Sequence, residues 1–195
     1  MLLFFLILVS AAAWYRFVQG SGDEISFEER RHRGSRHALA NCALPLGLAL
    51  IWAVTEGMDS FLQLMYVAAL ATALCDRIST ELGILYGRDP RLPLSELAAE
   101  PRTPGAVTAE GSLLGVAAVI VFAGLGAILG VCQALTAPAA IAGAAAACWL
   151  ESVRSEFAGK GDIELDSDWK NFMNTCVGAF LAAFLAIALG GEFYQ

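Results

Sequence analysis

The stretch Ala109–Val131 reads AEGSLLGVAAVIVFAGLGAILGV and decides the fold class. Its one charged residue, Glu110, stands at its beginning, and every other position is apolar or small. A helix needs about 20 mainly apolar residues to cross the hydrocarbon core of a bilayer. The stretch is long enough to do so, and it therefore predicts a membrane-spanning helix.

The composition of the whole chain agrees with a membrane protein. Of 195 residues, 57% are hydrophobic and 16% are charged, and the mean hydropathy is +0.62. This balance leaves too few charged side chains for a soluble domain to cover its surface. The net charge of −7 comes from scattered acids that form no charged tail, and we expect no nucleic-acid partner. The 5 cysteines stand apart without metal-ligand spacing, which predicts free thiols.

Five further apolar runs predict an all-α, polytopic transmembrane helix bundle of about six spans in one domain. The predicted spans are residues 2–17, 38–54, 61–82, 109–131, 136–153 and 172–189, with ends uncertain by roughly 2 to 4 residues. Long polar connections alternate with very short ones. All long connections therefore fall on one side of the membrane.

The basic residues orient this bundle. All 12 Lys and Arg residues fall in or beside the long connections: Arg16, Arg30, Arg31, Arg33, Arg36, Arg77, Arg88, Arg91, Arg102, Arg154, Lys160 and Lys170. Cytoplasmic loops carry such an excess, so we predict a cytoplasmic polar face with both termini outside, in a plasma membrane or an organellar equivalent. A cleaved signal peptide ending near Ala11–Ala13 is the alternative for the first run. The lack of a preceding basic region opposes it.

The block ALCDRISTELG, Ala73–Gly83, places ionisable residues at the end of a predicted span. A charge at the centre of a spanning helix costs roughly 2.5 to 3.5 kcal/mol on insertion scales, so such residues usually belong to a site. Asp76, Ser79 and Thr80 share one helical face at spacings of three and four. Glu81 lies about 140° around the helix from Asp76, so both reach one ligand only if the helix ends or bends at Gly83.

We interpret Asp76 and Glu81 as catalytic residues and Mg²⁺ ligands for a phosphorylated ligand, because Mg²⁺ takes one or two carboxylates together with phosphate oxygens. The alternative is an ion pair between Arg77 and Glu81, with Asp76 capping another helix.

The segment EPRTPGAVTAEGS, Glu100–Ser112, forms the predicted entrance to the span at 109–131. Its prolines exclude a continuous helix, Thr108 is a plausible N-cap, and a helix N-terminus attracts anions. The glycine spacing and terminal Lys-Ser/Thr of a P-loop are absent. An ordinary capped loop is the alternative. The predicted nucleotide- or phosphate-binding residues are Arg102, Thr103, Gly105, Thr108, Glu110 and Ser79.

Further polar residues stand at the same ends of other spans. Asn171 and Asn174 lie one helical turn apart, and an amide inside a span favours a ligand or an interhelical hydrogen bond. Asn41 is equivalent at the start of the second span, and Glu151 stands near Arg154, where a local salt bridge is the alternative. We predict that Asn41, Glu151, Asn171 and Asn174 bind substrate. Together these clusters indicate phosphoryl or nucleotidyl transfer onto a membrane-embedded lipid phosphate.

Four blocks resemble, in the same order, those of a known integral-membrane family. They are RGSRHALAN (33–41), AALATALCDRISTELG (68–83), PGAVTAEG (104–111) and NFMNT (171–175). The family includes phytyl-phosphate kinase of vitamin E biosynthesis and many members called domain of unknown function. The positions that match its polar or glycine pattern are Asn41, Asp76, Ser79, Glu81, Gly105, Glu110, Asn171 and Asn174. The departures are Arg77 for Thr, His37 for Gln, Cys42 for Gly and Glu151 for Asp.

The resemblance implies a kinase that phosphorylates a phytyl- or geranylgeranyl-type isoprenoid monophosphate, using Mg²⁺ and ATP or CTP. Two alternatives stay open at this point: a nucleotidyltransferase that forms a CDP-lipid, and a small non-enzymatic transporter or lipid-binding protein. Assembly as a homo-oligomer is also open.

Overall fold

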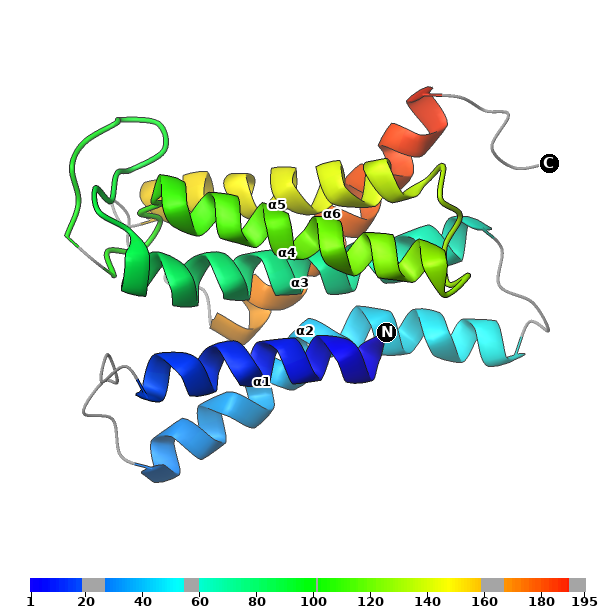
Figure 1. Cartoon of the computed structure of the whole chain (residues 1–195), viewed down its shortest axis with the longest axis horizontal. Helices are drawn as coiled ribbons and strands as arrows, with labels where there is room; N and C mark the ends of the chain where they lie inside the picture. Colours follow the sequence, from blue (N-terminus) through cyan, green and yellow to red (C-terminus); the bar gives the residue numbers. More distant parts are fainter. Residues whose placement is uncertain (19–26, 55–59, 101, 159–166, 190–195) are drawn as a thin grey trace.

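The computed structural model describes residues 1–18, 27–54, 60–100, 102–158 and 167–189. Side chains are described for these residues except 16–18, 27–38 and 167, for which only the backbone is described. Over these residues the chain forms the helices α1 (Leu2–Val18), α2 (Phe27–Val54), α3 (Ser60–Tyr86), α4 (Ala109–Ile128), α5 (Ala137–Ala158) and α6 (Ser167–Leu189) (Figure 1). Within the described ranges there is no strand beyond isolated bridges in the α3–α4 connection. The predicted all-α bundle is confirmed.

Three of the described helices are long and apolar enough to cross a membrane, namely Ser60–Tyr86, Ala109–Ile128 and Asp168–Leu189. Shorter apolar helical runs, Leu2–Tyr15 and Leu39–Val54, lie in α1 and α2. Because these apolar helices pack into one bundle, the chain is an integral membrane protein that associates with the bilayer.

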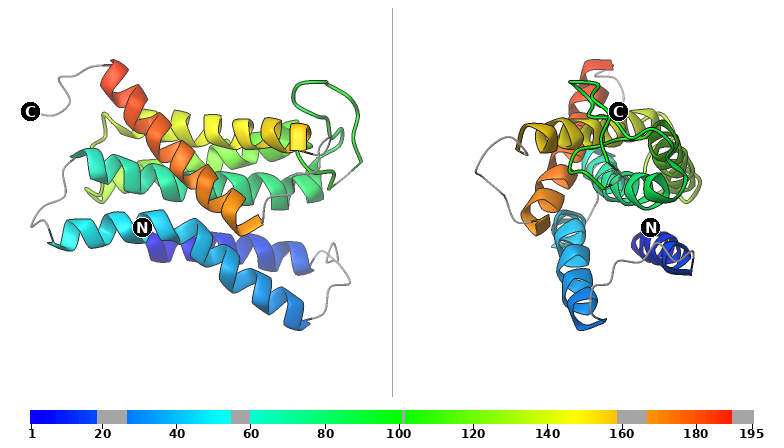
Figure 2. Two further views of the ribbon diagram at one scale, coloured as in Figure 1. Left: turned by 180° about the vertical axis from the view of Figure 1, so that it is seen from behind. Right: turned by 90° about the vertical axis from the view of Figure 1, so that its left-hand side faces the viewer.

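Several helices extend beyond the predicted spans. α2 begins at Phe27 where the apolar run begins near residue 38, α5 continues to Ala158, and α6 begins at Ser167. Glu, Arg and Lys are good helix formers, so a helix continues past the apolar residues that a bilayer requires. Pro45 lies inside α2, which bends along its length (Figure 2). Hydropathy thus marks the membrane-embedded part of each helix and leaves its polar extension unmarked.

α3 is the central helix, and each of the others packs against it. Its side chains Leu64, Val67, Leu70 and Leu74 are fully buried. Small residues allow close helix approach, as is usual in membrane bundles. A Cβ at Gly143 on α5 would lie 2.6 Å from the backbone nitrogen of Ala182 on α6. The bundle therefore holds α3 in a fixed position at its centre.

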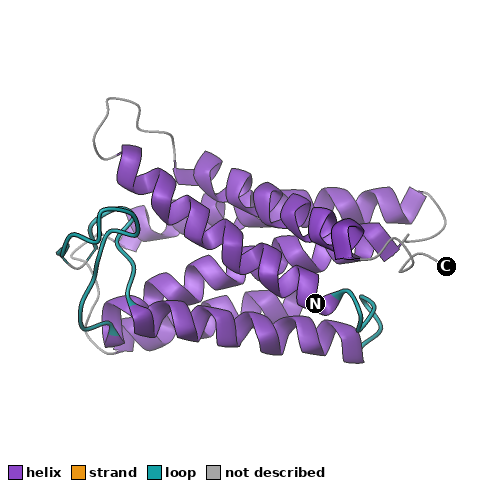
Figure 3. Cartoon of the chain, turned by 90° about the horizontal axis from the view of Figure 1, so that it is seen from above, coloured by secondary structure: helices purple, strands orange, loops and turns teal. Residues whose placement is uncertain are grey.

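The described helix ends that border the long connections lie toward one end of the bundle, as the alternation of connection lengths predicts. The end of α3 and the start of α4 lie beside the end of α5, while the start of α1 and the end of α6 lie toward the opposite end (Figure 1). Figure 3 shows the loop between α3 and α4, in teal, at the first of these ends. We call the first end the loop end. Of the basic residues used for orientation, Arg30, Arg31, Arg33, Arg36 and Lys160 lie outside the described side chains, as does Arg16.

Candidate functional site

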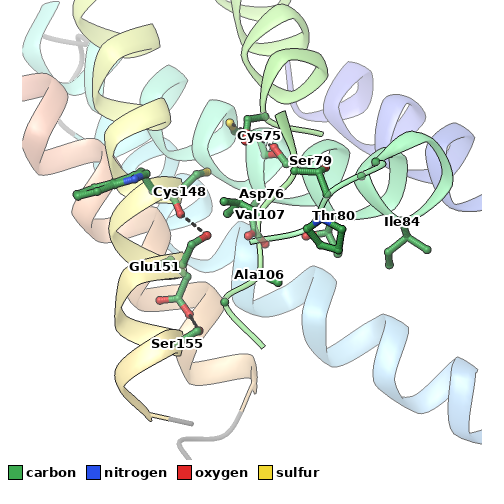
Figure 4. A pocket seen from close by; sticks show the side chains of 18 of the residues that line it. Cys75, Asp76, Ser79, Thr80, Ile84, Ala106, Val107, Cys148, Glu151 and Ser155 are labelled. Atoms are coloured by element: carbon green, nitrogen blue, oxygen red, sulfur yellow. Dashed lines mark hydrogen bonds between the residues drawn. The ribbon is translucent and has the colours of Figure 1, made fainter. Parts of the chain in front are cut away.

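A cavity of about 460 Å³ lies at the loop end, between α3, α4, α5 and the α3–α4 connection (Figure 4). This volume falls within the range of small-molecule sites. The polar side chains that line it are Asp76, Ser79, Thr80, Arg102, Thr103, Thr108, Ser112, Glu151, Ser152 and Ser155. Residues with carboxylate, hydroxyl and guanidinium groups therefore line one partly open cavity.

The α3 wall of the cavity carries Asp76, Ser79 and Thr80, which lie on the shared face that their spacing predicts. Asp76 is half-buried. The Ser79 hydroxyl donates to the Cys75 carbonyl at 2.7 Å, which fixes its direction toward α4. A Cβ at Gly115 on α4 would collide with Ser79 Oγ, so this glycine lets the two helices approach at the cavity.

Glu81 does not line the cavity. α3 continues as a helix through Gly83 to Tyr86, so Asp76 and Glu81 keep their separation around the helix. Glu81 is 3% exposed, and its Oε1 lies 3.5 Å from Arg77 Nε. The structure therefore shows the alternative ion pair and does not bring Asp76 and Glu81 to one ion. Arg77, which departs from the family pattern, lies on that second face.

The segment Gly105–Thr108 runs from α5 to α3 and forms another wall. Gly105 has φ +83°, and a Cβ there would lie 2.7 Å from the Ser152 carbonyl oxygen on α5. At the other end, a Cβ at Gly87 would lie 2.5 Å from Thr108 Cγ2. Figure 4 shows the backbone at Ala106 and Val107 between the two helices.

Thr108 is the N-cap of α4, because its side chain accepts a hydrogen bond from the Gly111 amide at 3.1 Å. Arg102 is exposed at φ +73°, and Thr103 donates through its hydroxyl to the Glu100 carbonyl at 2.8 Å. The predicted phosphate-binding residues Arg102, Thr103, Gly105 and Thr108 therefore come together at the cavity. Glu110, in the first turn of α4, does not line it.

The α5 wall carries the second carboxylate of the cavity, Glu151. Its Oε2 accepts a hydrogen bond from Arg154 Nε at 2.8 Å, so the predicted alternative of a local salt bridge is present. Glu151 nevertheless lines the cavity and acts electrostatically on Asp76. Two residues 75 positions apart (from 76 to 151) thus place their carboxylates at one site.

The predicted substrate residues on α2 and α6, namely Asn41, Asn171 and Asn174, do not line this cavity. Asn174 is 5% exposed and lies close to Cys148, which does line it. Its Oδ1 has no hydrogen-bond partner among the described residues. Asn174 therefore stands behind the α5 wall. All five cysteines are free, as predicted.

One residue at the site has no marker in the sequence pattern. Glu156, 5% exposed near the end of α5, accepts hydrogen bonds from the backbone amides of Leu94 at 2.9 Å and Ser95 at 3.2 Å. Its partners lie 62 and 61 positions away, beyond the reach of any local pattern. From the sequence alone, an acidic residue close to a helix end is expected to lie on the surface.

The donor set suits a hard cation that keeps most of its own water and phosphate ligands. Among the described residues, no group of three or more His, Cys, Asp or Glu side chains is arranged to hold a metal. Mg²⁺ does not need such a cage, because it commonly binds one or two carboxylates together with substrate phosphates. Asp76 and Glu151 are the two residues of the cavity that could supply such carboxylates, and the hydroxyl residues Ser79 and Thr80 line the same cavity.

An all-helical membrane bundle with a polar cavity at one end defines the class of protein. This chain belongs to the family described as Integral membrane protein DUF92, whose pattern matches residues 1–154. The resemblance drawn from the four sequence blocks is thereby confirmed at the level of the family.

Three relatives illustrate the relationship. Protein VTE6, chloroplastic, from Arabidopsis thaliana is 24% identical over 93% of this chain and 56% of its own length. Uncharacterized membrane protein sll0875 from Synechocystis is 38% identical over 48% of this chain and 34% of its own. Uncharacterized membrane protein MJ0933 from Methanocaldococcus jannaschii is 33% identical over 43% and 34%. The match thus spans 56% of the length of VTE6 and 34% of the length of each of the other two relatives. No solved structure matches it.

Proposed function

We propose that this protein is a membrane-embedded kinase that converts an isoprenoid monophosphate to the diphosphate with a nucleoside triphosphate and Mg²⁺. The observation that carries the proposal is that Asp76, Glu151 and Arg102 line one cavity at the start of α4. Carboxylates suit a metal-bound polyanion, and a cation beside exposed backbone amides suits its phosphates. The family resemblance supports the phytyl- or geranylgeranyl-type substrate.

The reaction needs little covalent chemistry from the protein. A terminal oxygen of the lipid monophosphate attacks the γ-phosphorus of ATP or CTP, and the bond from that phosphorus to the β–γ bridging oxygen breaks. The products are the lipid diphosphate and a nucleoside diphosphate. A phosphate monoester has a second pKa of about 6, so the nucleophile is already ionised at neutral pH and needs no general base. Positioning and charge neutralisation are the remaining tasks.

These tasks assign roles to the residues that line the cavity. Asp76 would hold the Mg²⁺, with Glu151 as the second carboxylate, and the ion would draw charge from the phosphate oxygens. Arg102 would neutralise phosphate charge from the connection. Thr103 and Ser79 would offer their hydroxyls to the same phosphates by turning away from the Glu100 and Cys75 carbonyls to which they donate in this structure. Glu81 and Glu110 take no part in this assignment because neither lines the cavity.

The apolar part of the cavity accounts for a lipid substrate. Val116 on α4 and Ala145 on α5 line its inner side, and Trp149 lines it while 51% exposed on the bundle surface. Trp is enriched at the level of lipid headgroups. A lipid phosphate at that level would meet the carboxylates while its chain stays among apolar side chains. We further propose that the loop end is cytoplasmic.

The test is turnover by the purified protein with phytyl or geranylgeranyl monophosphate, Mg²⁺ and either ATP or CTP. We expect the lipid diphosphate and a nucleoside diphosphate, both identified by mass spectrometry. Release of pyrophosphate with a CDP-lipid would instead establish nucleotidyl transfer. Flux of the lipid or its phosphate in vesicles, without turnover of any isoprenoid phosphate, would overturn the kinase in favour of a transporter.

A further inference from the structure

We propose that Glu156 is a positioning residue that clamps the α3–α4 connection to α5, so that Arg102 and Thr103 meet the phosphates in the cavity. This inference rests on the proposed function for its effect on substrate. Its structural part stands on the hydrogen bonds that Glu156 accepts from the backbone amides of Leu94 and Ser95.

The clamp holds the connection at two points. Glu156 accepts hydrogen bonds from the backbone amides of Leu94 at 2.9 Å and Ser95 at 3.2 Å. Eleven positions after Leu94 (94 to 105), Gly105 packs so closely on α5 that a Cβ there would lie 2.7 Å from the Glu156 amide nitrogen. The segment that carries Arg102 and Thr103 is therefore tied to the last turns of α5 on both sides.

Glu156 is a buried carboxylate, and burying a carboxylate costs free energy unless hydrogen bonds replace its hydration. A carboxylate with 5% exposure gives up most of its hydration, and hydrogen bonds to backbone amides offset that loss. Charge-assisted bonds of this kind are stronger than neutral ones. Glu156 does not line the cavity, so it would act on substrate through the connection.

The connection has internal structure that passes this restraint to the cavity. The amides and carbonyls of Arg91 and Val107 exchange hydrogen bonds at 2.9 and 2.8 Å, and the Leu92 amide bonds to the Leu97 carbonyl at 3.0 Å. The Thr103 amide bonds to the Glu100 carbonyl at 3.1 Å. A displacement at Leu94 or Ser95 would therefore move the whole segment, including its phosphate-facing residues.

The decisive variant is Glu156→Gln. Glutamine keeps the size of the side chain, but its NH₂ group cannot accept a hydrogen bond, so one of the two amides loses its acceptor. The matched control is Glu96→Gln, which makes the same charge change at an exposed position of the same connection. Both proteins would be purified in detergent with the full chain intact.

Two measurements separate a clamp from a general loss of stability. Hydrogen exchange at Leu94 and Ser95 should become about 10-fold faster in Glu156→Gln, with exchange in α3 and α6 unchanged. The KM for the nucleoside triphosphate should rise about 10-fold while kcat stays within about twofold, because the catalytic carboxylates are intact. A merely structural role would lower kcat through loss of active protein and leave KM unchanged.

The outcomes keep this inference distinct from the kinase proposal. Unchanged exchange at Leu94 and Ser95 would overturn the clamp whatever the activity. If the wild-type protein turns over no isoprenoid phosphate, the kinase fails, and calorimetric titration with inorganic triphosphate decides the clamp. Weaker binding to Glu156→Gln than to wild type and Glu96→Gln would support it, and equal or undetectable binding in all three proteins would overturn it.

Discussion

At the scale of single residues, two carboxylates of one helix have separate surroundings. Asp76 faces the cavity and Glu81 is buried against Arg77 on the other side of α3. The two residues are five positions apart on a continuous helix. Each residue is rotated by about 100° about the helix axis from the one before it, so their side chains leave the helix on different faces. The two acids should therefore respond differently to removal of their charge.

We predict that Asp76→Asn abolishes Mg²⁺-dependent turnover, with kcat lower by about 100-fold or more, because the variant removes the carboxylate that we propose as the Mg²⁺ ligand. Glu81→Gln should keep kcat within a few-fold and lower the free energy of unfolding by roughly 1 to 3 kcal/mol, because it breaks a partly buried ion pair. Kinetics and thermal unfolding in detergent measure both. A loss of turnover in Glu81→Gln with normal stability would contradict this division of roles.

Gly105 is a second residue whose identity the site requires. We predict that Gly105→Ala lowers the free energy of unfolding by roughly 1 to 3 kcal/mol, because alanine is strained at positive φ and its Cβ would collide with the α5 backbone. The connection should detach and become sensitive to proteolysis. Gly130→Ala is the matched control, since Gly130 has φ +69° with no atom within 4 Å of its added Cβ. Equal effects of the two changes would argue against docking at α5.

At the scale of secondary-structure elements, the approach of α3 and α4 shapes the cavity. Gly115 lies against Ser79, and Gly111 would place a Cβ 2.6 Å from the Ser79 carbonyl oxygen. Small residues on one face of α4 thus set the distance between two walls. The rest of α4 exposes large apolar side chains such as Leu113 and Ile120, which suits contact with lipid.

We predict that Gly115→Ala separates α3 from α4, lowers the thermal unfolding temperature of the detergent-solubilised protein and reduces turnover by displacing Ser79. Gly124→Ala, on the same helix but with nothing within 4 Å of its added Cβ, should be neutral or slightly stabilising because alanine favours helix over glycine. The comparison uses circular dichroism melts and steady-state kinetics. Two variants with the same melting temperature would exclude a specific α3–α4 contact at Gly115.

At the scale of the whole molecule, the bundle has two chemically different ends. The cavity, Arg88, Arg91 and Arg102 belong to the loop end, and the start of α1 and the end of α6 lie toward the other end. Because basic connections stay in the cytoplasm, we predict that both termini are outside. Epitope tags at the two termini should be detected on intact cells or spheroplasts. A cysteine at Ser95 should react with a membrane-impermeant maleimide only after permeabilisation. The reverse pattern would contradict the orientation.

The helical membrane class and the polar face of α3 could both be predicted from the amino-acid sequence. Both depend on local quantities: the length of an apolar run, and the rotation per residue that places Asp76 and Ser79 together. The concentration of polar connections at one end follows equally from their alternating lengths. The proposed phosphate-binding residues of the α3–α4 connection could also be picked out in the sequence, because Thr108 and the prolines before it mark the start of a helix.

Which carboxylates share a cavity follows from the packing of the helices and could not be predicted from the sequence. Glu151 joins Asp76, and Glu156 binds the amides of Leu94 and Ser95, because α3, α4 and α5 pack side by side at the loop end. Glu81 leaves the site because α3 continues past Gly83. Contacts between residues more than 60 positions apart depend on how helices pack together, and no periodicity within one helix carries that information.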